Sequence, residues 1–196
     1  MTGAKYILTL VTLYTLTTSS NCHKSNSPTN QLPPETHSGL NTMGCLVNGQ
    51  LFIPQSTGNP PPPFSSAYRV VFNGITSIVF NWADLPNCGL SEMKIFLDSV
   101  QLQVGDTLTL GLMPDSNLVY IGKAQWADYE SFPCDSGPVS NPYTTTSQVT
   151  GQMIIDYYEN ATDISLVAGR FFFDAIGKYG DTIHVREGRF DMAIQN

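Results

Sequence analysis

The chain contains no run of about 20 apolar residues, the length that a transmembrane helix needs, so we expect the mature protein not to cross a membrane as a helix. Charge is also scarce. Only 13% of the 196 residues are charged, and 9 Lys and Arg against 16 Asp and Glu give a net charge of -7. Because nucleic-acid binding depends on clustered Lys and Arg that neutralise phosphates, this balance argues against a nucleic-acid binder.

Sequence motifs of catalysis are missing as well. There is no Gly-x-Ser-x-Gly motif, and His184 is the only histidine of the expected folded domain. It alternates with Thr182 and Arg186 on a polar face, which indicates a solvated strand histidine and not the base of a hydrolytic triad. No glycine-rich loop opens a helix, which leaves no phosphate cradle for a nucleotide. We therefore expect a protein that is not an enzyme and has no cofactor.

The spacings of metal ligands are also missing. No two cysteines form a Cys-x-x-Cys pair, and no Asp-x-Asp-x-Asp-Gly loop occurs. Asp128 and Glu130 share a face if extended, but this pattern is typical of a solvated strand end. The sequence predicts no metal site. Carboxylates that could cleave glycosides are present, but sequence alone does not place two of them face to face.

The chain begins with a segment typical of an export signal. Lys5 precedes an apolar run over residues 6–16, and small polar residues follow, which predicts a signal peptide over residues 1–21. Cys22 follows directly and is the expected lipidation site, although Asn21 departs from the small residue usual before such a cysteine. Acyl chains contribute about 0.8 kcal/mol per buried methylene, so two or three would anchor the protein firmly. The alternative is an ordinary cysteine that forms half of a disulfide.

Residues 22–42 are rich in Ser, Asn, Thr and Pro and predict a flexible tether after the lipidated N-terminus. From residue 43 to residue 196 the hydrophobic period is two, which predicts a single all-β domain. Asn48-Gly49 and Asn73-Gly74 each separate two apolar runs and predict hairpins. Further strands are expected over 93–99, 107–112, 118–126, 149–158, 164–173 and 182–194. A change of phase at Glu187-Gly188 predicts a bulge or a tight turn. About eight to ten short strands predict an antiparallel β-sandwich or barrel.

Three cysteines remain after Cys22, so at most one disulfide forms within the chain. Cys88 and Cys134 lie in loop-like sequence and are the expected pair, whereas Cys45 lies in an apolar strand and is expected to be a buried free thiol. Closing a loop of this length contributes roughly 3–5 kcal/mol in the chain-entropy model.

One group of aromatic residues is a candidate binding surface. Trp126 and Tyr129 flank Asp128 near the expected end of a strand. Aromatic rings stack on sugar rings, and a carboxylate supplies hydrogen bonds, so these three residues predict a ligand platform. The alternative is that the aromatic residues only pack in the core or at its edge.

Two stretches of sequence resemble a known family. The first is the opening Leu32-Pro33-Pro34-Glu35-Thr36, Gly39 and Asn41-Thr42-Met43-Gly44-Cys45-Leu46-Val47-Asn48-Gly49, and the second includes Gly169-Arg170-Phe171-Phe172-Phe173 and Gly188-Arg189-Phe190-Asp191. Together they resemble a family of Bacteroidota lipoproteins that has a domain of unknown function. Met43 stands where that family usually has an aromatic residue.

The resemblance implies a cell-envelope lipoprotein with a β domain and adds no chemistry. In the phylum of this family, lipoproteins displayed on the cell surface resemble one another in carrying acidic residues just after the lipidated cysteine. None of residues 23–27 is acidic, which favours the periplasmic side of the outer membrane, with surface exposure as the alternative. We therefore expect a lipid-anchored, non-enzymatic binding or assembly component with an unknown protein or glycan partner. The alternatives are a carbohydrate-binding module and a carrier that holds a small apolar ligand inside a barrel.

Overall fold

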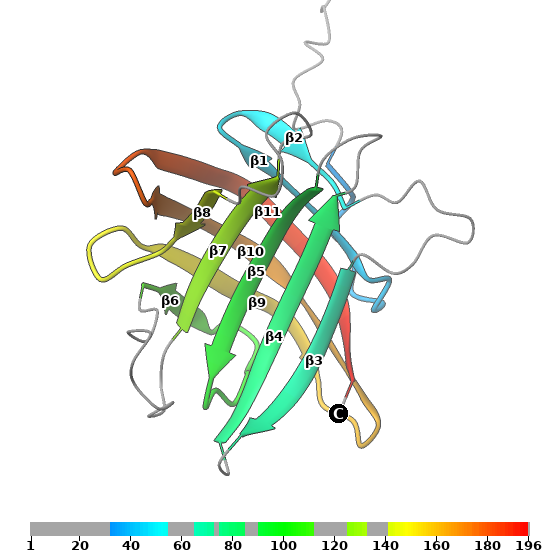
Figure 1. Cartoon of the computed structure of the whole chain (residues 1–196). Helices are drawn as coiled ribbons and strands as arrows, with labels where there is room; N and C mark the ends of the chain where they lie inside the picture. Colours follow the sequence, from blue (N-terminus) through cyan, green and yellow to red (C-terminus); the bar gives the residue numbers. More distant parts are fainter. Residues whose placement is uncertain are drawn as a thin grey trace, which may run out of the picture.

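The computed structural model describes residues 32–54, 65–72, 75–84, 90–111, 125–132 and 141–195. These residues form strands and connections without a helix, so none of them forms a helix that could span a membrane (Figure 1). The strands are β1 (Thr42–Val47), β2 (Gln50–Phe52), β3 (Ser65–Phe72), β4 (Ile75–Asp84), β5 (Leu90–Asp98), β6 (Thr107–Leu110), β7 (Gln125–Phe132), β8 (Asn141–Thr144), β9 (Gly151–Glu159), β10 (Ile164–Gly177) and β11 (Thr182–Gln195).

The strands belong to one sheet with the order β2-β1-β11-β3-β4-β5-β7-β8-β10-β9-β6, and β10 also pairs with β11. This extra pairing closes a ring that runs from β11 through β3, β4, β5, β7, β8 and β10 back to β11. Every ladder is antiparallel except the short parallel pairing of β11 with β3. The predicted all-β, mainly antiparallel class is confirmed, and the closed pairing gives the sheet a barrel-like form (Figure 1).

The tight turns lie where the sequence predicts them. Asn48 and Gly49 between β1 and β2 have φ values of 51° and 79°, the positive range that an Asn-Gly hairpin requires. Phe72 of β3 pairs with Ile75 of β4, so two residues connect these strands. The bulge near Glu187 is confirmed too: Phe171 pairs with Gly188 and Phe173 with Val185, which leaves one β10 residue opposite two β11 residues.

Two strands differ from the prediction. β7 runs from Gln125 to Phe132, whereas the sequence predicts a strand that ends at Trp126 and begins at residue 118; residues 118–124 lie outside the described part. β8, which contains Pro142, was not predicted. Outward Asp128 and Glu130 interrupt the apolar pattern of β7, and Pro142 interrupts that of β8; pairing with neighbouring strands supplies the stability that the local sequence lacks.

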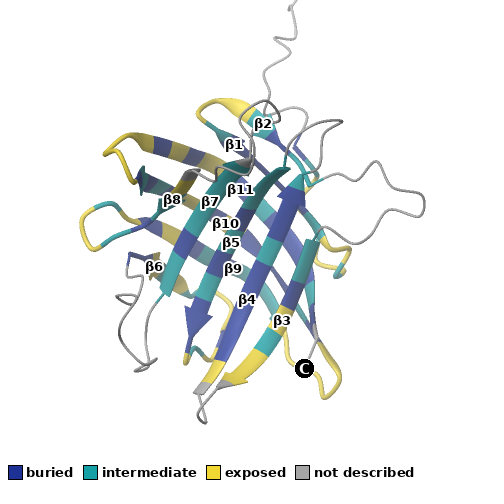
Figure 2. Cartoon of the chain, viewed as in Figure 1, coloured by how far each residue is buried: buried dark blue, intermediate teal, exposed yellow. Residues whose placement is uncertain are grey.

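Aromatic side chains fill the interior between the two layers of strands. Trp82 of β4 stacks on Phe80 and on Phe171 of β10, each with ring centroids 5.7 Å apart, and Phe190 of β11 packs against all three. The Trp82 indole nitrogen donates to the Met192 sulfur at 3.5 Å. Buried positions alternate along much of β5 and β9, as a two-residue period requires, whereas residues 77–80 of β4 are buried in succession (Figure 2).

Residues 32–41, which the sequence assigns to the flexible tether, lie against the sheet and form a segment termed the strap. Its main attachment is Asp191 of β11, which is only 2% exposed. The Asp191 carboxylate accepts hydrogen bonds from the Thr36 hydroxyl at 2.6 Å, the Ser38 amide at 3.0 Å and the Gly39 amide at 2.7 Å. The described part of the predicted tether is therefore bound to the folded domain.

Further contacts hold both ends of the strap. The Asn41 side-chain oxygen accepts from the Ala193 amide at 3.0 Å, and the His37 ring stacks on Tyr157 with centroids 5.0 Å apart. Leu32 is 8% exposed and lies over Gly44, where any side chain would collide with the neighbouring proline. The first part of the opening motif thus supplies residues that attach the strap to the sheet, and its second part, residues 42–49, forms β1 and the turn that follows.

Three predicted cysteine roles fall on residues 22, 88 and 134, which lie outside the described part of the chain. Cys45 in β1 is described and is a buried free thiol, as expected. Burial raises the pKa of the Cys45 thiol strongly, which keeps it protonated and unreactive in the folded chain.

Candidate functional site

The structure brings together two of the three residues predicted to form a ligand platform. Trp126 and Asp128 lie on the outer face of β7, because they are two positions apart in a strand. Tyr129 points to the opposite face, where it packs against the core and meets Phe52 edge-on at 6.0 Å. Tyr129 therefore supports the fold beneath the platform and does not belong to its surface.

Strand register adds neighbours to Trp126 and Asp128. Phe96 of β5 is directly opposite Trp126, Lys94 is opposite Asp128, and Glu92 is opposite Glu130. On the other side of β5, Asn81 of β4 is directly opposite Lys94. These residues form the outer-face patch, which consists of Asn81, Glu92, Lys94, Phe96, Trp126, Asp128 and Glu130. In Figure 1 the middle of β4, β5 and β7 faces the viewer with no other element in front of it.

The apolar part of the patch is an aromatic pair. The Phe96 and Trp126 rings are nearly parallel, with centroids 5.6 Å apart and planes inclined by 19°. Both side chains are half-buried, so the pair is braced on the sheet and still reaches solvent. Such cross-strand aromatic pairs stabilise antiparallel strands and hold both rings in fixed orientations.

The polar part of the patch centres on one ammonium group. Lys94 Nζ forms an ion pair with Glu92 Oε2 at 2.8 Å. Burial of Lys94 works against its charged form, but the hydrogen bond to Glu92 and the charges of the three nearby carboxylates outweigh this effect and raise the pKa of Lys94. Lys94 is therefore a permanent cation at neutral pH.

Asp128 has the most perturbed carboxyl group of the patch. Burial is the largest effect and raises the pKa of Asp128 to about 7; Lys94 opposes the rise, and Glu92 and Glu130 add to it. Burial therefore makes the protonated form accessible near neutral pH, and a neighbouring positive charge would favour the ionised form.

Asn81 contributes an acceptor without a partner. Its side-chain oxygen is buried and has no hydrogen-bond partner within the part of the chain that the structure describes. An unsatisfied buried acceptor costs on the order of 1–3 kcal/mol. Sequence reasoning had no signal for this residue, because its position beside Lys94 depends on the pairing of β4 with β5.

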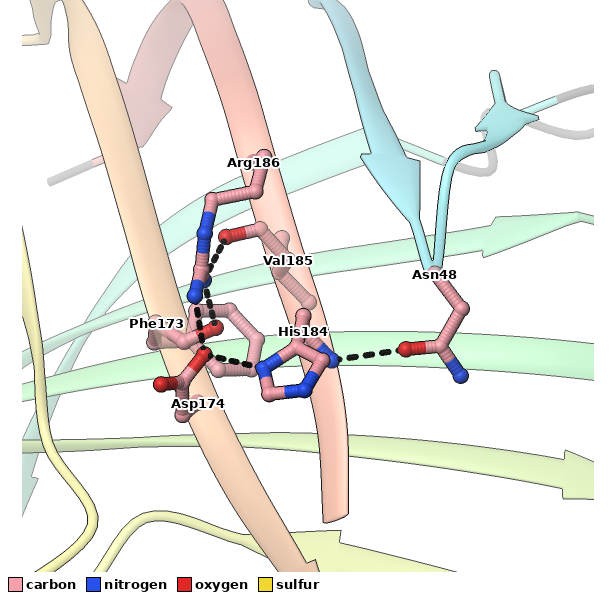
Figure 3. Close-up of polar contacts among 6 residues, drawn as sticks. All are labelled: Asn48, Phe173, Asp174, His184, Val185 and Arg186. Carbon is pink, nitrogen blue, oxygen red and sulfur yellow. Dashed lines mark hydrogen bonds and ion pairs between the residues drawn. The ribbon is translucent and has the colours of Figure 1, made fainter.

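A second polar cluster surrounds His184 (Figure 3) and lies in the back layer, the strands β1, β9, β10 and β11 that lie behind β4, β5 and β7 in Figure 1. His184 Nδ1 lies 2.8 Å from Asp174 Oδ1, and the guanidinium group of Arg186 contacts the same oxygen. The His184 amide donates to the Asn48 side-chain oxygen at 2.9 Å. Burial alone would raise the pKa of Asp174, but the hydrogen bonds from His184 and Arg186 lower it.

This second cluster ties the β1–β2 turn to β10 and β11. Arg186 also donates to the Phe173 and Val185 carbonyls, at 3.0 and 2.8 Å. The predicted polar strand histidine is thus exposed and also hydrogen-bonded to a carboxylate. The register of the β10–β11 hairpin puts Asp174 directly opposite His184.

A shallow hollow lies between the strap and the sheet. Its lining includes Glu35, His37, Arg189 and Phe190. Because an acidic and a basic group both line the hollow, its charge favours neither an anionic nor a cationic ligand. Among the described residues, no three His, Cys, Asp or Glu side chains come together in a way that would hold a metal ion.

Comparison of this chain with protein-family models, with curated proteins and with solved structures finds no match. The closed all-β sheet and the outer-face patch therefore stand on the sequence and the geometry alone.

Proposed function

We propose that this chain is a non-enzymatic binding component of a cell envelope and that the outer-face patch is its ligand surface. The observation that carries the proposal is the fixed Phe96–Trp126 ring pair next to a row of charged groups on the same two strands, β5 and β7. Side chains on paired strands are held more rigidly than those on loops, which reduces the entropy lost when a ligand binds.

A saccharide is the ligand class that the patch favours. Sugar rings present apolar C–H faces that stack on aromatic rings, and their hydroxyl groups donate to carboxylates and amide oxygens. Trp126 supplies the ring, while Asp128 and Glu130 supply acceptors two and four positions along the same face of β7. This arrangement corresponds to the carbohydrate-binding module expected as an alternative from the sequence.

The test is titration of an oligosaccharide panel by isothermal calorimetry, which measures affinity in the native chain and equally in variants that lack Trp126. Trp82 is fully buried, so a change in the tryptophan emission of the native chain would in addition report on Trp126. We expect binding by the native chain and about a tenfold loss of affinity in Trp126→Ala, since aromatic stacking contributes about 0.5–1.5 kcal/mol beyond the apolar area that it buries. Tyr179→Ala is the matched control, because Tyr179 is 81% exposed on another surface. Equal affinity of Trp126→Ala and the native chain would show that the outer-face patch is not the ligand surface.

The anchor is the second part of the proposal. Acylation of Cys22 would hold the protein on the outer membrane, and the sequence after Cys22 favours the periplasmic side. We expect Cys22→Ser to move from the membrane fraction to the soluble fraction after a salt wash, and protease added to intact cells to leave the native protein undigested. A membrane-bound Cys22→Ser form would contradict lipid anchoring.

A disulfide between Cys88 and Cys134 is also part of this proposal, because exported proteins retain disulfides. Intact mass after thiol alkylation, measured with and without reductant, tests it. Alkylation of both residues without reductant would contradict the pairing.

An apolar-ligand carrier receives less support from the geometry. Trp82, Phe171 and Phe190 occupy the interior between the layers and are each at most 4% exposed. A fatty acid that raised the melting temperature by several degrees would favour this alternative over the patch.

A further inference from the structure

The outer-face patch has more negative than positive groups. Glu92, Asp128 and Glu130 face a single ammonium group, that of Lys94, and this group is 2.8 Å from Glu92. With Lys94 bound to Glu92, no ion pair joins Asp128 or Glu130 to a cation within the described ranges of the chain. Each carboxylate has a like-charged neighbour on the same face, and the single positive charge of Lys94, which acts on all three, leaves an excess of negative charge.

Asn81 is an independent observation that points in the same direction. Its buried side-chain oxygen lacks a donor and lies in the row that continues through Lys94 and Asp128. The unpaired amide oxygen therefore adds a partial negative charge beneath the row of carboxylates. The row favours a ligand that brings positive charge and hydrogen-bond donors over one that brings further acceptors.

The geometry of β7 sets the shape of a ligand that would meet this need. Trp126, Asp128 and Glu130 are successive outward residues, spaced roughly 7 Å apart because a strand rises about 3.4 Å per residue. A sugar ring stacked on Trp126 would place a substituent of the same or the next ring beside Asp128. Cations are also attracted to the face of an indole ring.

We propose that the saccharide recognised by the outer-face patch carries free, protonated amino groups, so that its ring stacks on Trp126 and its ammonium groups pair with Asp128 and Glu130. This inference rests on the proposed function, because it names the ligand class of the same surface. The ammonium groups supply both the donors and the positive charge that the row lacks. An N-acetylated sugar of the same shape supplies neither.

The experiment compares β-1,4-linked glucosamine oligomers with N-acetylglucosamine oligomers of the same length, titrated into the full mature chain at pH 6.5. We expect the free-amine oligomer to bind at least about tenfold more tightly, because hydrogen bonds to charged groups contribute about 1.5–3 kcal/mol. We expect this preference to fall several-fold in Glu130→Gln and to weaken with added salt. Asp156→Asn is the control, since Asp156 pairs with Arg170 on the back layer.

The outcomes separate the two proposals. Equal binding of both oligomers that still requires Trp126 would overturn the amine preference and leave saccharide binding intact. Binding of neither oligomer, with folding confirmed by circular dichroism, would overturn both for this sugar type. A lysine-rich peptide that binds as tightly as the glucosamine oligomer, with the same dependence on Glu130, would overturn the saccharide and identify a cationic peptide as the ligand.

Discussion

At the residue scale, Asp191 shows how one carboxylate organises the N-terminal strap. It is nearly inaccessible to solvent and accepts three hydrogen bonds from Thr36, Ser38 and Gly39. We expect Asp191→Asn to lower the free energy of unfolding by about 2–4 kcal/mol, because an amide nitrogen would face donors that need an anion. Urea denaturation measures the change.

Asp156→Asn is the matched control for Asp191. The Asp156 carboxylate pairs with Arg170 at the surface, and exposed pairs contribute about 0–1 kcal/mol. Burial alone would raise the pKa of Asp191, but its hydrogen bonds lower it below the ordinary value of 3.8. Its stabilising contribution is therefore present above pH 3.8 and is lost as the pH falls through the lowered pKa. Equal destabilisation by both variants would contradict the role of Asp191.

Asp128 has the opposite pH dependence. Its pKa is about 7 in the folded chain and 3.8 ordinarily, so the folded state binds a proton more tightly than the unfolded state does. Stability is therefore lost as the pH rises from 3.8 to 7 and stays constant above that range. Between pH 5 and pH 8 we expect the native chain to lose about 2 kcal/mol more than Asp128→Asn, after allowing for partial solvation. Parallel urea curves at both pH values test this; identical losses in both proteins would contradict it.

At the element scale, the strap depends on a close approach that only glycine permits. Gly39 has a φ of 66°, and a Cβ atom there would lie 2.6 Å from a Leu166 methyl group. Gly180 has a similar φ of 86° but open space around it. We expect Gly180→Ala to cost about 1 kcal/mol of stability and Gly39→Ala about 2–3 kcal/mol, since the latter adds a steric clash to the backbone strain.

Thermal unfolding of both glycine variants measures the difference. Cleavage by a protease within residues 32–41 should increase in Gly39→Ala and stay unchanged in Gly180→Ala. Equal melting temperatures for the two variants would show that the strap does not pack closely against Leu166.

Strands with local signals were predictable, and strands that depend on partners were not. Asn48-Gly49 and Asn73-Gly74 identified two hairpins because the backbone of a two-residue turn needs positive φ. The charged outer face of β7 and Pro142 in β8 break the apolar alternation that predicts a strand. These two strands form through their partners, β7 by pairing with β5 and β8 by pairing with β10. The strap was hidden for the same reason, because its polar residues bind a carboxylate about 150 residues away in sequence.

The candidate site was predictable in part. Trp126 and Asp128 share a face because they are two positions apart, whereas Tyr129 is an odd number of positions from Trp126 and had to face the other way in a strand. Once the strand extends past Trp126, the two-residue period places Tyr129 on the inner face and excludes it from the ligand platform. Lys94, Glu92 and Asn81 come from other strands, and only the register brings them to the patch.

At the scale of the whole molecule, two short pairings close the ring of strands. β3 meets β11 through two residue pairs, and β8 meets β10 through two. Both junctions end on the long β10–β11 ladder, and the core aromatic residues of the two layers pack on one another, with Trp82 of β4 stacked on Phe171 of β10. Because this packing joins the two layers directly and not only through the short pairings, we expect the described sheet to unfold as one cooperative unit.

Cys45 offers a direct measure of that cooperativity. It is fully inaccessible in β1 and its thiol stays protonated, so an alkylating reagent reaches it only after opening. We expect the labelling rate of the Cys45 peptide, followed by mass spectrometry, to rise with urea as steeply as global unfolding does. Labelling that is fast without urea and insensitive to low urea concentrations would show that β1 and β2 detach from β11 separately. The Asn48–His184 contacts would then stabilise only that hairpin, and unfolding would proceed in at least two steps.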